Sequence, residues 1–158
     1  MSSKKKKPGD GNLSFNRKAL HDYHVLERYE AGVALVGTEV KVVREGGASL
    51  IGAYIKADGG CLMLHQVNIP PYTFGNRFNH DSQRSRQLLM HKNEIRKLRA
   101  LQEQKGLALI PLRLYLSARG VVKVEVGVCR GKNVQDKRET VKRRDADREA
   151  RREMVRYR

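Results

Sequence analysis

Hydrophobic and polar residues alternate in several short runs along this chain. The clearest runs are residues 110–116 and 122–128, where Ile, Leu or Val occupies every second position on both sides of an Ala-Arg-Gly turn. This alternation predicts an antiparallel hairpin with one face on a core and the other in water. Pro111 would interrupt the hydrogen-bond ladder, which indicates a sheet edge or a bulge at that position.

Other runs have the same period. Residues 21–29 carry Tyr and Val on alternate positions and predict a first strand. Residues 49–56 and 61–67 predict a second hairpin, because Asp58-Gly59-Gly60 between them supplies the positive φ angles of a tight turn. The stretch that follows, 68–82, is rich in Pro, Gly and Asn and predicts an irregular loop of a length that is often functional.

One segment near the first strand has the spacing of a helix. Apolar residues recur at helical intervals in residues 31–44, namely at Val33, Val36, Val40 and Val43. This spacing favours a buried amphipathic helix. The many β-branched residues leave a strand as the alternative.

A second segment predicts the best helix of the chain, over residues 84–105. Leu88, Ile95 and Leu98 form one apolar stripe at helical spacing. Gly106 follows where a C-terminal capping glycine would stand.

Strands in hairpins with few helices between them indicate a mainly β fold. We expect a small antiparallel OB-like β-barrel with two to three α-helices and a basic C-terminal tail. The chain then divides into a flexible basic arm, residues 1–12, the barrel, residues 13–130, and the tail, residues 131–158.

The tail has no continuous hydrophobic face, and its basic residues outnumber its acidic ones. Its charges are ordered as on a helix, since Glu139 precedes Arg143 by four residues and Asp136 with Glu139 resembles an N-terminal cap. A helix that is polar all round gains little from packing, so we expect this tail to be disordered alone and ordered by a polyanion. The alternative is a solvated tail that aids solubility.

Charge narrows the class of partner. The 158 residues carry a formal net charge of +16 with an isoelectric point near 10.2, which favours nucleic acid over a membrane surface. No apolar run approaches the roughly 20 residues that would span a bilayer, and no apolar segment follows the basic start, so we expect a cytoplasmic protein without a membrane. Cys61 and Cys129 are far apart and predict free thiols.

Catalytic and cofactor motifs are weak. Residues 127–133 have three residues between the glycines where a P-loop has four, and Asn133 stands where a magnesium ligand belongs. Two pairs could belong to a metal or acid–base site, His21 with His24 and His80 with Asp81, but neither has a matching second pair of ligands in the sequence. We therefore expect neither a metal nor a cofactor.

Several residues are candidates for direct contact with RNA. Arg84 and Arg86 would meet phosphates at the start of the predicted long helix, or form an ordinary solvated turn. His91 would be a partly buried member of the apolar stripe, or a contact at the helix edge. Five aromatic residues could stack on bases, although core packing is the commoner role: Tyr23, Tyr29, Tyr54, Tyr72 and Phe74.

A set of short motifs, in order along the chain, resembles one family. The motifs are Asn16-Arg17-Lys18-Ala19, Tyr29-Glu30-Ala31-Gly32, Gly37-Thr38-Glu39-Val40-Lys41, Asn79-His80-Asp81, Arg84-Ser85-Arg86-Gln87-Leu88-Leu89, Lys123-Val124-Glu125-Val126-Gly127 and Asp136-Lys137-Arg138-Glu139-Thr140. Together they resemble the transfer-messenger RNA-binding family, also called small protein B.

The resemblance implies a barrel that grips the tRNA-like domain of transfer-messenger RNA, and a tail that enters the decoding site and messenger channel of a stalled ribosome, on the 16S rRNA of the small subunit. It implies a monomer in the RNA complex and no enzyme activity. The implied gripping surface is Glu30, Leu89 and His91, with Asn16, Arg17, Lys18, His21 and Tyr23 beside them.

For the tail, the resemblance implies ribosome contacts near the decoding site from Lys132, Asp136, Lys137 and Arg138, and we extend them along the channel to Lys142, Arg143 and Arg144. At position 135 the family often has His or Tyr, suited to stacking on a ribosomal base, whereas this chain has Gln135.

Two other functions stay open at this point. A basic ribosomal or assembly protein would bind rRNA permanently, without a rescue role. A small nuclease or RNA-modifying enzyme would use His21, Asp22 and His24.

Overall fold

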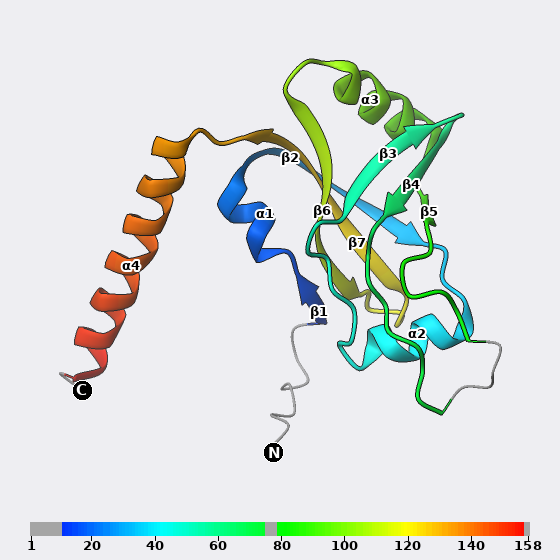
Figure 1. Ribbon diagram of the computed structural model, residues 1–158, viewed down its shortest axis with the longest axis horizontal. Coiled ribbons are helices and arrows are strands. Elements are labelled where there is room, and N and C mark those ends of the chain that lie inside the picture. The colour runs from blue at the N-terminus through cyan, green and yellow to red at the C-terminus, as the bar shows by residue number, and fades with distance from the viewer. Residues whose placement is uncertain (1–10, 75–78, 157–158) are drawn as a thin grey trace.

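The computed structural model describes residues 11–74 and 79–156 (Figure 1). Its elements, in chain order, are β1 (Asn12–Phe15), α1 (Arg17–Asp22), β2 (Tyr23–Val33), α2 (Gly37–Arg44), β3 (Tyr54–Asp58), β4 (Cys61–His65), β5 (Arg86–Leu89), α3 (Lys92–Glu103), β6 (Leu107–Leu116), β7 (Val122–Gly131) and α4 (Val134–Arg156). Most of the predicted basic arm lies outside the described residues, and Asn12 already belongs to β1.

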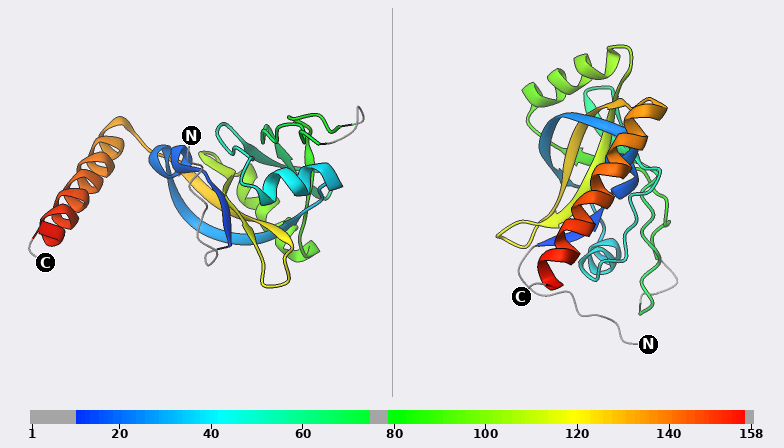
Figure 2. Two further views of the ribbon diagram at one scale, coloured as in Figure 1. Left: turned by 90° about the horizontal axis from the view of Figure 1, so that it is seen from below. Right: turned by 90° about the vertical axis from the view of Figure 1, so that its left-hand side faces the viewer.

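Six of these strands form a closed antiparallel barrel. The order is β6-β3-β4-β5-β2-β7, and β7 pairs back onto β6, so the ring has no free edge. β1 pairs with β6 outside the ring. Helices α2 and α3 cover opposite ends of the barrel, and α4 leaves it as a separate arm (Figures 1 and 2). The predicted fold class, a small mainly antiparallel barrel with helices, is confirmed.

The hairpin of β6 and β7 follows the alternating pattern with one exception. Val122, Val124, Val126 and Val128 all lie in the barrel core. In β6 the register shifts between Pro111 and Arg113, which confirms the predicted bulge.

This bulge divides the side chains of β6 between two cores. Leu109 and Leu114 face the barrel interior, whereas Ile110 and Leu112 lie in a second cluster with Ala19 and Cys129. The prediction that β6 is apolar on one face throughout is therefore wrong, because the extra residue reverses the alternation. Burial raises the pKa of the Cys129 thiol to about 11.

The predicted helix over 84–105 is wrong in its first part. Arg86–Leu89 is strand β5, and the helix α3 begins only at Lys92. Arg86 and Leu88 are the two buried positions of this strand, two residues apart, so Leu88 faces the barrel by strand period and not by helical period. The remainder of the stripe, from Ile95 to Leu98, does face the core from α3.

The predicted helix over 31–44 is confirmed only from Gly37. Strand β2 continues to Val33, and α2 spans Gly37–Arg44. Val36 is the residue before the helix and is exposed, whereas Val42 and Val43 are buried. The pairing of β2 with β7 extends to Gly32 opposite Lys123, and these ladder bonds override the helical spacing of the valines.

The hairpin of β3 and β4 is confirmed, with Gly59 and Gly60 at φ of +55° and +86° in its turn. Its first strand begins at Tyr54, later than predicted, and Ser49 makes only an isolated bridge with Asn68. The described part of the 68–82 loop contains no helix or strand, and residues 75–78 lie outside the described residues.

Candidate nucleic-acid interface

The tail is a helix whose start differs from the predicted one. The Oδ1 atom of Asn133 accepts the backbone N–H of Asp136 at 2.9 Å, so Asn133 is the N-terminal cap of α4 and the predicted cap at Asp136 is wrong. Asp136 lies in the first turn, where its negative charge is stabilised by the helix dipole.

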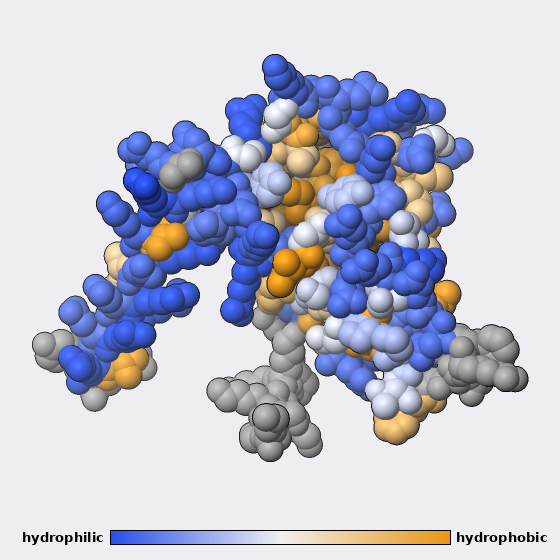
Figure 3. Space-filling model, viewed as in Figure 1, coloured by the Kyte–Doolittle hydropathy of each residue, from blue (hydrophilic) through white to orange (hydrophobic). Residues whose placement is uncertain are grey.

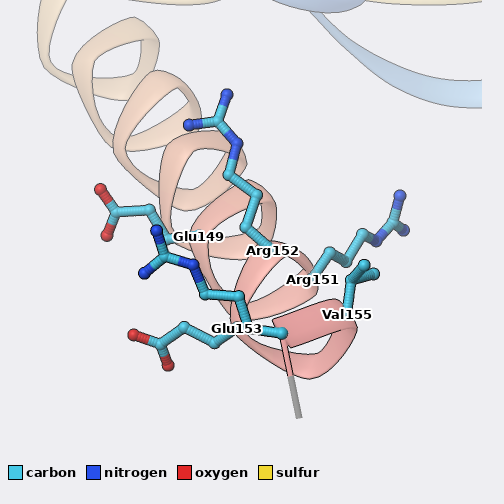
Figure 4. A pocket seen from close by; sticks show the side chains of 6 residues that line it. Glu149, Arg151, Arg152, Glu153 and Val155 are labelled. Atoms are coloured by element: carbon cyan, nitrogen blue, oxygen red, sulfur yellow. The ribbon is translucent and has the colours of Figure 1, made fainter. Parts of the chain in front are cut away.

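Beyond its first turns, α4 stands free of the barrel (Figures 1 and 2). Every residue from Val141 to Arg156 is exposed. Near the end of the helix the side chains of Glu149, Arg151, Arg152, Glu153 and Val155 point in different directions around the axis, so no apolar face forms (Figure 4). The structure therefore presents Lys142, Arg143 and Arg144 as exposed basic side chains on α4.

The base of α4 is tied to α1 by polar contacts. The Nζ atom of Lys132 donates to the backbone O of Leu20 at 3.2 Å and to Thr140 Oγ1 at 3.0 Å. The Nζ atom of Lys137 lies 3.5 Å from Asp22 Oδ1, and His24 Nε2 lies 3.3 Å from Asp136 Oδ2.

These contacts define the tail junction, made of Lys132, Asp136 and Lys137 with Asp22 and His24. The hydrogen bond from His21 lowers the pKa of Asp22; burial acts in the opposite direction, and Lys137 adds to the lowering. Gln135 and Arg138, also in the first turns, are exposed.

The non-basic candidates lie on the paired strands β2 and β5 and on the residue before α3. Gly32 of β2 pairs with Leu89 of β5. Glu30 lies two residues before Gly32 on β2, and His91 lies two residues after Leu89, just before α3. Leu89 is 55% exposed, and His91 is an exposed residue just before α3. The interpretation of His91 as a partly buried stripe residue is therefore wrong, since β5 precedes it in place of a helix.

Glu30 is exposed and held by neighbours on the barrel. Its carboxylate accepts a hydrogen bond from Lys123 on β7. The bond from Lys123 and a second from Tyr115 lower the pKa of Glu30. The carboxylate is therefore fixed in its charged form on this surface, where it can accept hydrogen bonds from base edges.

Helix α1 presents two basic side chains and hides one polar residue. Arg17 and Lys18 are exposed on its first turn. Asn16 is 2% exposed: its Oδ1 caps α1 by accepting from Ala19 N at 3.1 Å, and its Nδ2 donates to Pro111 O at 2.9 Å. Asn16 therefore holds α1 on the barrel, and its amide does not reach the surface.

His21 and Tyr23 flank the end of α1. The Nδ1 atom of His21 lies 2.9 Å from Asp22 Oδ1. Tyr23 is half-buried and packs against the second cluster.

Arg84 and Arg86 do not start a helix, and the structure gives Arg86 a different role. Arg86 is fully buried, pairs with the fully buried Glu39 of α2 and donates to Val67 O at 2.8 Å. Arg84 Nη2 lies 2.5 Å from the same carboxylate. Arg86 cannot meet RNA phosphates from this position, and the prediction for it is wrong.

The Glu39 trio, made of the buried Glu39 and Arg86 and the partly exposed Arg84, connects α2 to β5. Burial would raise the pKa of Glu39, but the bonds from Arg84, from the backbone N–H of Val36 and from Arg86 outweigh it and lower the pKa. The sequence signal for Glu39 was its position on the face of α2 that also carries the buried valines.

The histidines of the two predicted pairs make local polar contacts. His80 Nδ1 bonds Thr38 Oγ1 at 2.8 Å and its Nε2 bonds Ile69 O at 2.9 Å, which ties the 68–82 loop to α2. Within residues 11–74 and 79–156, no group of three or more His, Cys, Asp or Glu side chains is arranged to bind a metal ion. None of the helices in those ranges is both long and apolar enough to cross a membrane.

Comparison with known proteins gives one consistent result. The family model described as "SmpB protein" matches residues 13–156. The chain is 49% identical over 146 residues to the SsrA-binding protein of Desulforamulus reducens, covering 92% of this chain and 91% of that one, and 51% identical over 134 residues to the SsrA-binding protein of Moorella thermoacetica, covering 85% and 86%. A solved structure described as "tmRNA-SmpB: a journey to the center of the bacterial ribosome" is similar with a TM-score of 0.65 and 46% identity, covering 80% of this chain and 92% of that one.

Proposed function

The chain belongs to the SmpB protein family, and we propose that it binds the tRNA-like domain of transfer-messenger RNA and brings that RNA to stalled ribosomes for rescue. The observation that carries this proposal is the match along almost the whole chain, at about half identity, to proteins named for binding SsrA RNA. A related structure named for the bacterial ribosome supports the second partner. The role asks the protein to bind and position RNA, and this requires no bond-making chemistry of its own.

We propose that the barrel grips transfer-messenger RNA through Glu30, Leu89 and His91, the gripping surface. Glu30 lies on β2, Leu89 on β5 and His91 just before α3, and the pairing of Gly32 with Leu89, which joins β2 to β5, supports this assignment. A carboxylate, an exposed leucine and an imidazole cannot attract RNA by bulk charge, so their contribution would be contact with bases and sugars. Arg17 and Lys18 on α1, and the partly exposed Arg84 of the Glu39 trio, would add phosphate contacts.

We propose that the tail works on the ribosome as a separate unit. Lys132, Asp136 and Lys137 at the tail junction, with the exposed Gln135 and Arg138, would lie near the decoding site of the 16S rRNA. Lys142, Arg143 and Arg144 would follow into the messenger channel, where their exposed charges meet phosphates. Gln135 would offer an amide hydrogen bond in place of a stacked ring.

The tail helix has little to hold it before it reaches RNA. Ordering costs roughly 1–2 kcal/mol per residue, and no apolar side chain from Val141 to Arg156 is buried to offset this. We propose that α4 is frayed in the free protein and becomes fully helical on the ribosome. Nuclear magnetic resonance of the free protein should give near random-coil shifts beyond about Val141, and persistent helical shifts would oppose this.

The experiment that tests the main proposal is to identify the RNA that the protein carries out of cells. The tagged full-length chain should co-purify with one abundant RNA that has a tRNA-like end. Predominant recovery of rRNA would instead support the alternative, a basic ribosomal or assembly protein. Truncation after Arg130 should leave transfer-messenger RNA binding largely intact and abolish rescue, because the gripping surface precedes the cut.

The proposed role is that of a monomer working in the cytoplasm, where the ribosomes are. The related proteins are RNA-binding, and a nuclease using His21, Asp22 and His24 is a weaker candidate, because Asp22 is engaged by Lys137 and His24 by Asp136.

A further inference from the structure

A cavity of about 300 Å³ opens on the outside of the barrel, between α1 and the segment that leads into β3. Ala108 and Ile110 of β6 form part of its lining, and Gly52 and Ala53 form another part. Figure 3 shows an apolar area at this place, over β6 and between α1 and β3, with hydrophilic residues around it. The volume is at the lower end of the range for small-molecule sites, about 300–1,000 Å³, which suits one heterocycle more than a larger ligand.

The aromatic ring of Tyr54 forms part of the cavity lining. Tyr54 is 41% exposed and points away from the barrel interior, since its neighbour Ile55 is the buried residue of the strand. Its cross-strand partner is His65, and the two rings stack with centroids 5.1 Å apart. The ring of His65 is itself held by Ser85 Oγ at 2.9 Å. The Tyr54 ring is therefore a supported platform with part of its surface open to a ligand.

The polar side chains around the cavity favour an uncharged ring inside it and a phosphate outside it. Lys18 and Tyr23 line the cavity, and their side chains make no hydrogen bond or ion pair within the described part of the chain. Asp22 also lines it, and both of its side-chain contacts, with His21 and with Lys137, are made by Oδ1. A carboxylate in the wall repels a phosphate from the interior, whereas Lys18 on the exposed first turn of α1 can meet one outside.

We propose that this cavity holds one unpaired nucleobase of a partner RNA, stacked on Tyr54, with the adjoining phosphate at Lys18. Aromatic platforms beside a basic side chain are the usual means by which proteins bind unpaired bases. The site is distinct from the gripping surface and adjoins the tail junction through Asp22. The inference rests on the proposed function, since it takes the partner to be RNA, and either transfer-messenger RNA or the 16S rRNA can supply the base.

The test compares Tyr54→Ala with the matched control Tyr54→Phe, which keeps the ring and removes only the hydroxyl group. Binding of each full-length variant is measured separately to the tRNA-like domain and to isolated small ribosomal subunits at fixed salt. Loss of a stacked base should weaken binding about 5- to 100-fold in one of the two arms for Tyr54→Ala. Tyr54→Phe should stay within about twofold of wild type in both arms.

A second measurement identifies the base and does not depend on affinity. A photo-crosslinking amino acid at Ile51, an exposed residue next to Gly52, should join one unpaired nucleotide of the RNA whose arm responded to Tyr54→Ala. Wild-type affinity of a folded Tyr54→Ala in both arms, or crosslinks only to protein, would overturn the cavity proposal. If the wild-type chain binds neither RNA, the proposed function itself fails, so the two failures are distinguishable.

Discussion

Replacing Glu39 with Ala should cost more stability than any other single removal of a carboxylate in the described residues. Glu39 and Arg86 are both fully buried, and Arg84 Nη2 lies 2.5 Å from the same carboxylate. Glu39→Ala leaves the Arg86 guanidinium buried with Val67 O and two distant carbonyls as its only acceptors. Removal of one partner from a buried ion pair costs about 3–5 kcal/mol, a large share of the roughly 5–15 kcal/mol by which proteins are stable.

Urea unfolding followed by circular dichroism at neutral pH measures this loss. Glu103→Ala is the matched control, because Glu103 is exposed and lies 3.7 Å from Arg99, a surface pair worth at most about 0.5 kcal/mol. The double variant Glu39→Leu with Arg86→Met should recover most of the stability, since apolar residues of similar volume replace both charges. A loss below about 1 kcal/mol for Glu39→Ala would refute the role given to the Glu39 trio.

Three further predictions address the surface, the tail and pH. Glu30→Arg should weaken binding to the tRNA-like domain, measured by fluorescence anisotropy, although it raises the net charge, and tighter binding would exclude the proposed gripping surface. Paired replacement of Lys137 and Arg138 by Ala should reduce tagging on stalled ribosomes more than paired replacement of Arg151 and Arg152 by Ala. The reason is that Lys137 and Arg138 lie in the first turns of α4, at the tail junction, where they set the register of the helix on the rRNA. Equal losses would mean that the tail acts only through its total charge. Because the pKa of Glu39 is lowered in the folded protein, its charged form stabilises the fold above the ordinary carboxyl pKa, and this stabilisation is lost as the pH falls below about 4. The free energy of unfolding should therefore fall less steeply with acid in Glu39→Gln than in wild type.

Local patterns were sufficient for the elements whose side chains obey one period throughout. The valines of β7 all face the core, and the glycines after Asp58 take the positive φ angles of their turn, so both hairpins were predictable. The bulge at Pro111 was predictable as well, because a residue without an N–H cannot continue a ladder. Its effect on Ile110 and Leu112 was not, since a second core exists only after α1 packs on the outside of the barrel.

The spacing of apolar residues gave a wrong prediction where a strand and a helix follow each other within one run of regularly spaced apolar residues. Leu88 lies at helical distance from Ile95, yet it belongs to β5 and the stripe continues on α3. Arg86, in the same strand, was expected at the surface because a buried guanidinium needs a carboxylate partner, and none is close to it in the sequence. Its partner, Glu39, is 47 positions away and is brought to it by the fold. Helix α1 was missed for a similar reason: its cap, Asn16, is held by Pro111 of a distant strand.

The sequence by itself determined the class of partner and the family, because a charge of +16 and a set of ordered motifs depend on residue identity alone. It also determined the hairpins, whose contacts are local. Only the tertiary structure decided which residues are neighbours: Gly32 and Leu89 are 57 positions apart and pair between β2 and β5, and Tyr54 borders a cavity lined by residues of α1 and β6. These residues become neighbours when the strands pair and the barrel closes. A local sequence pattern does not indicate which strands will pair with each other.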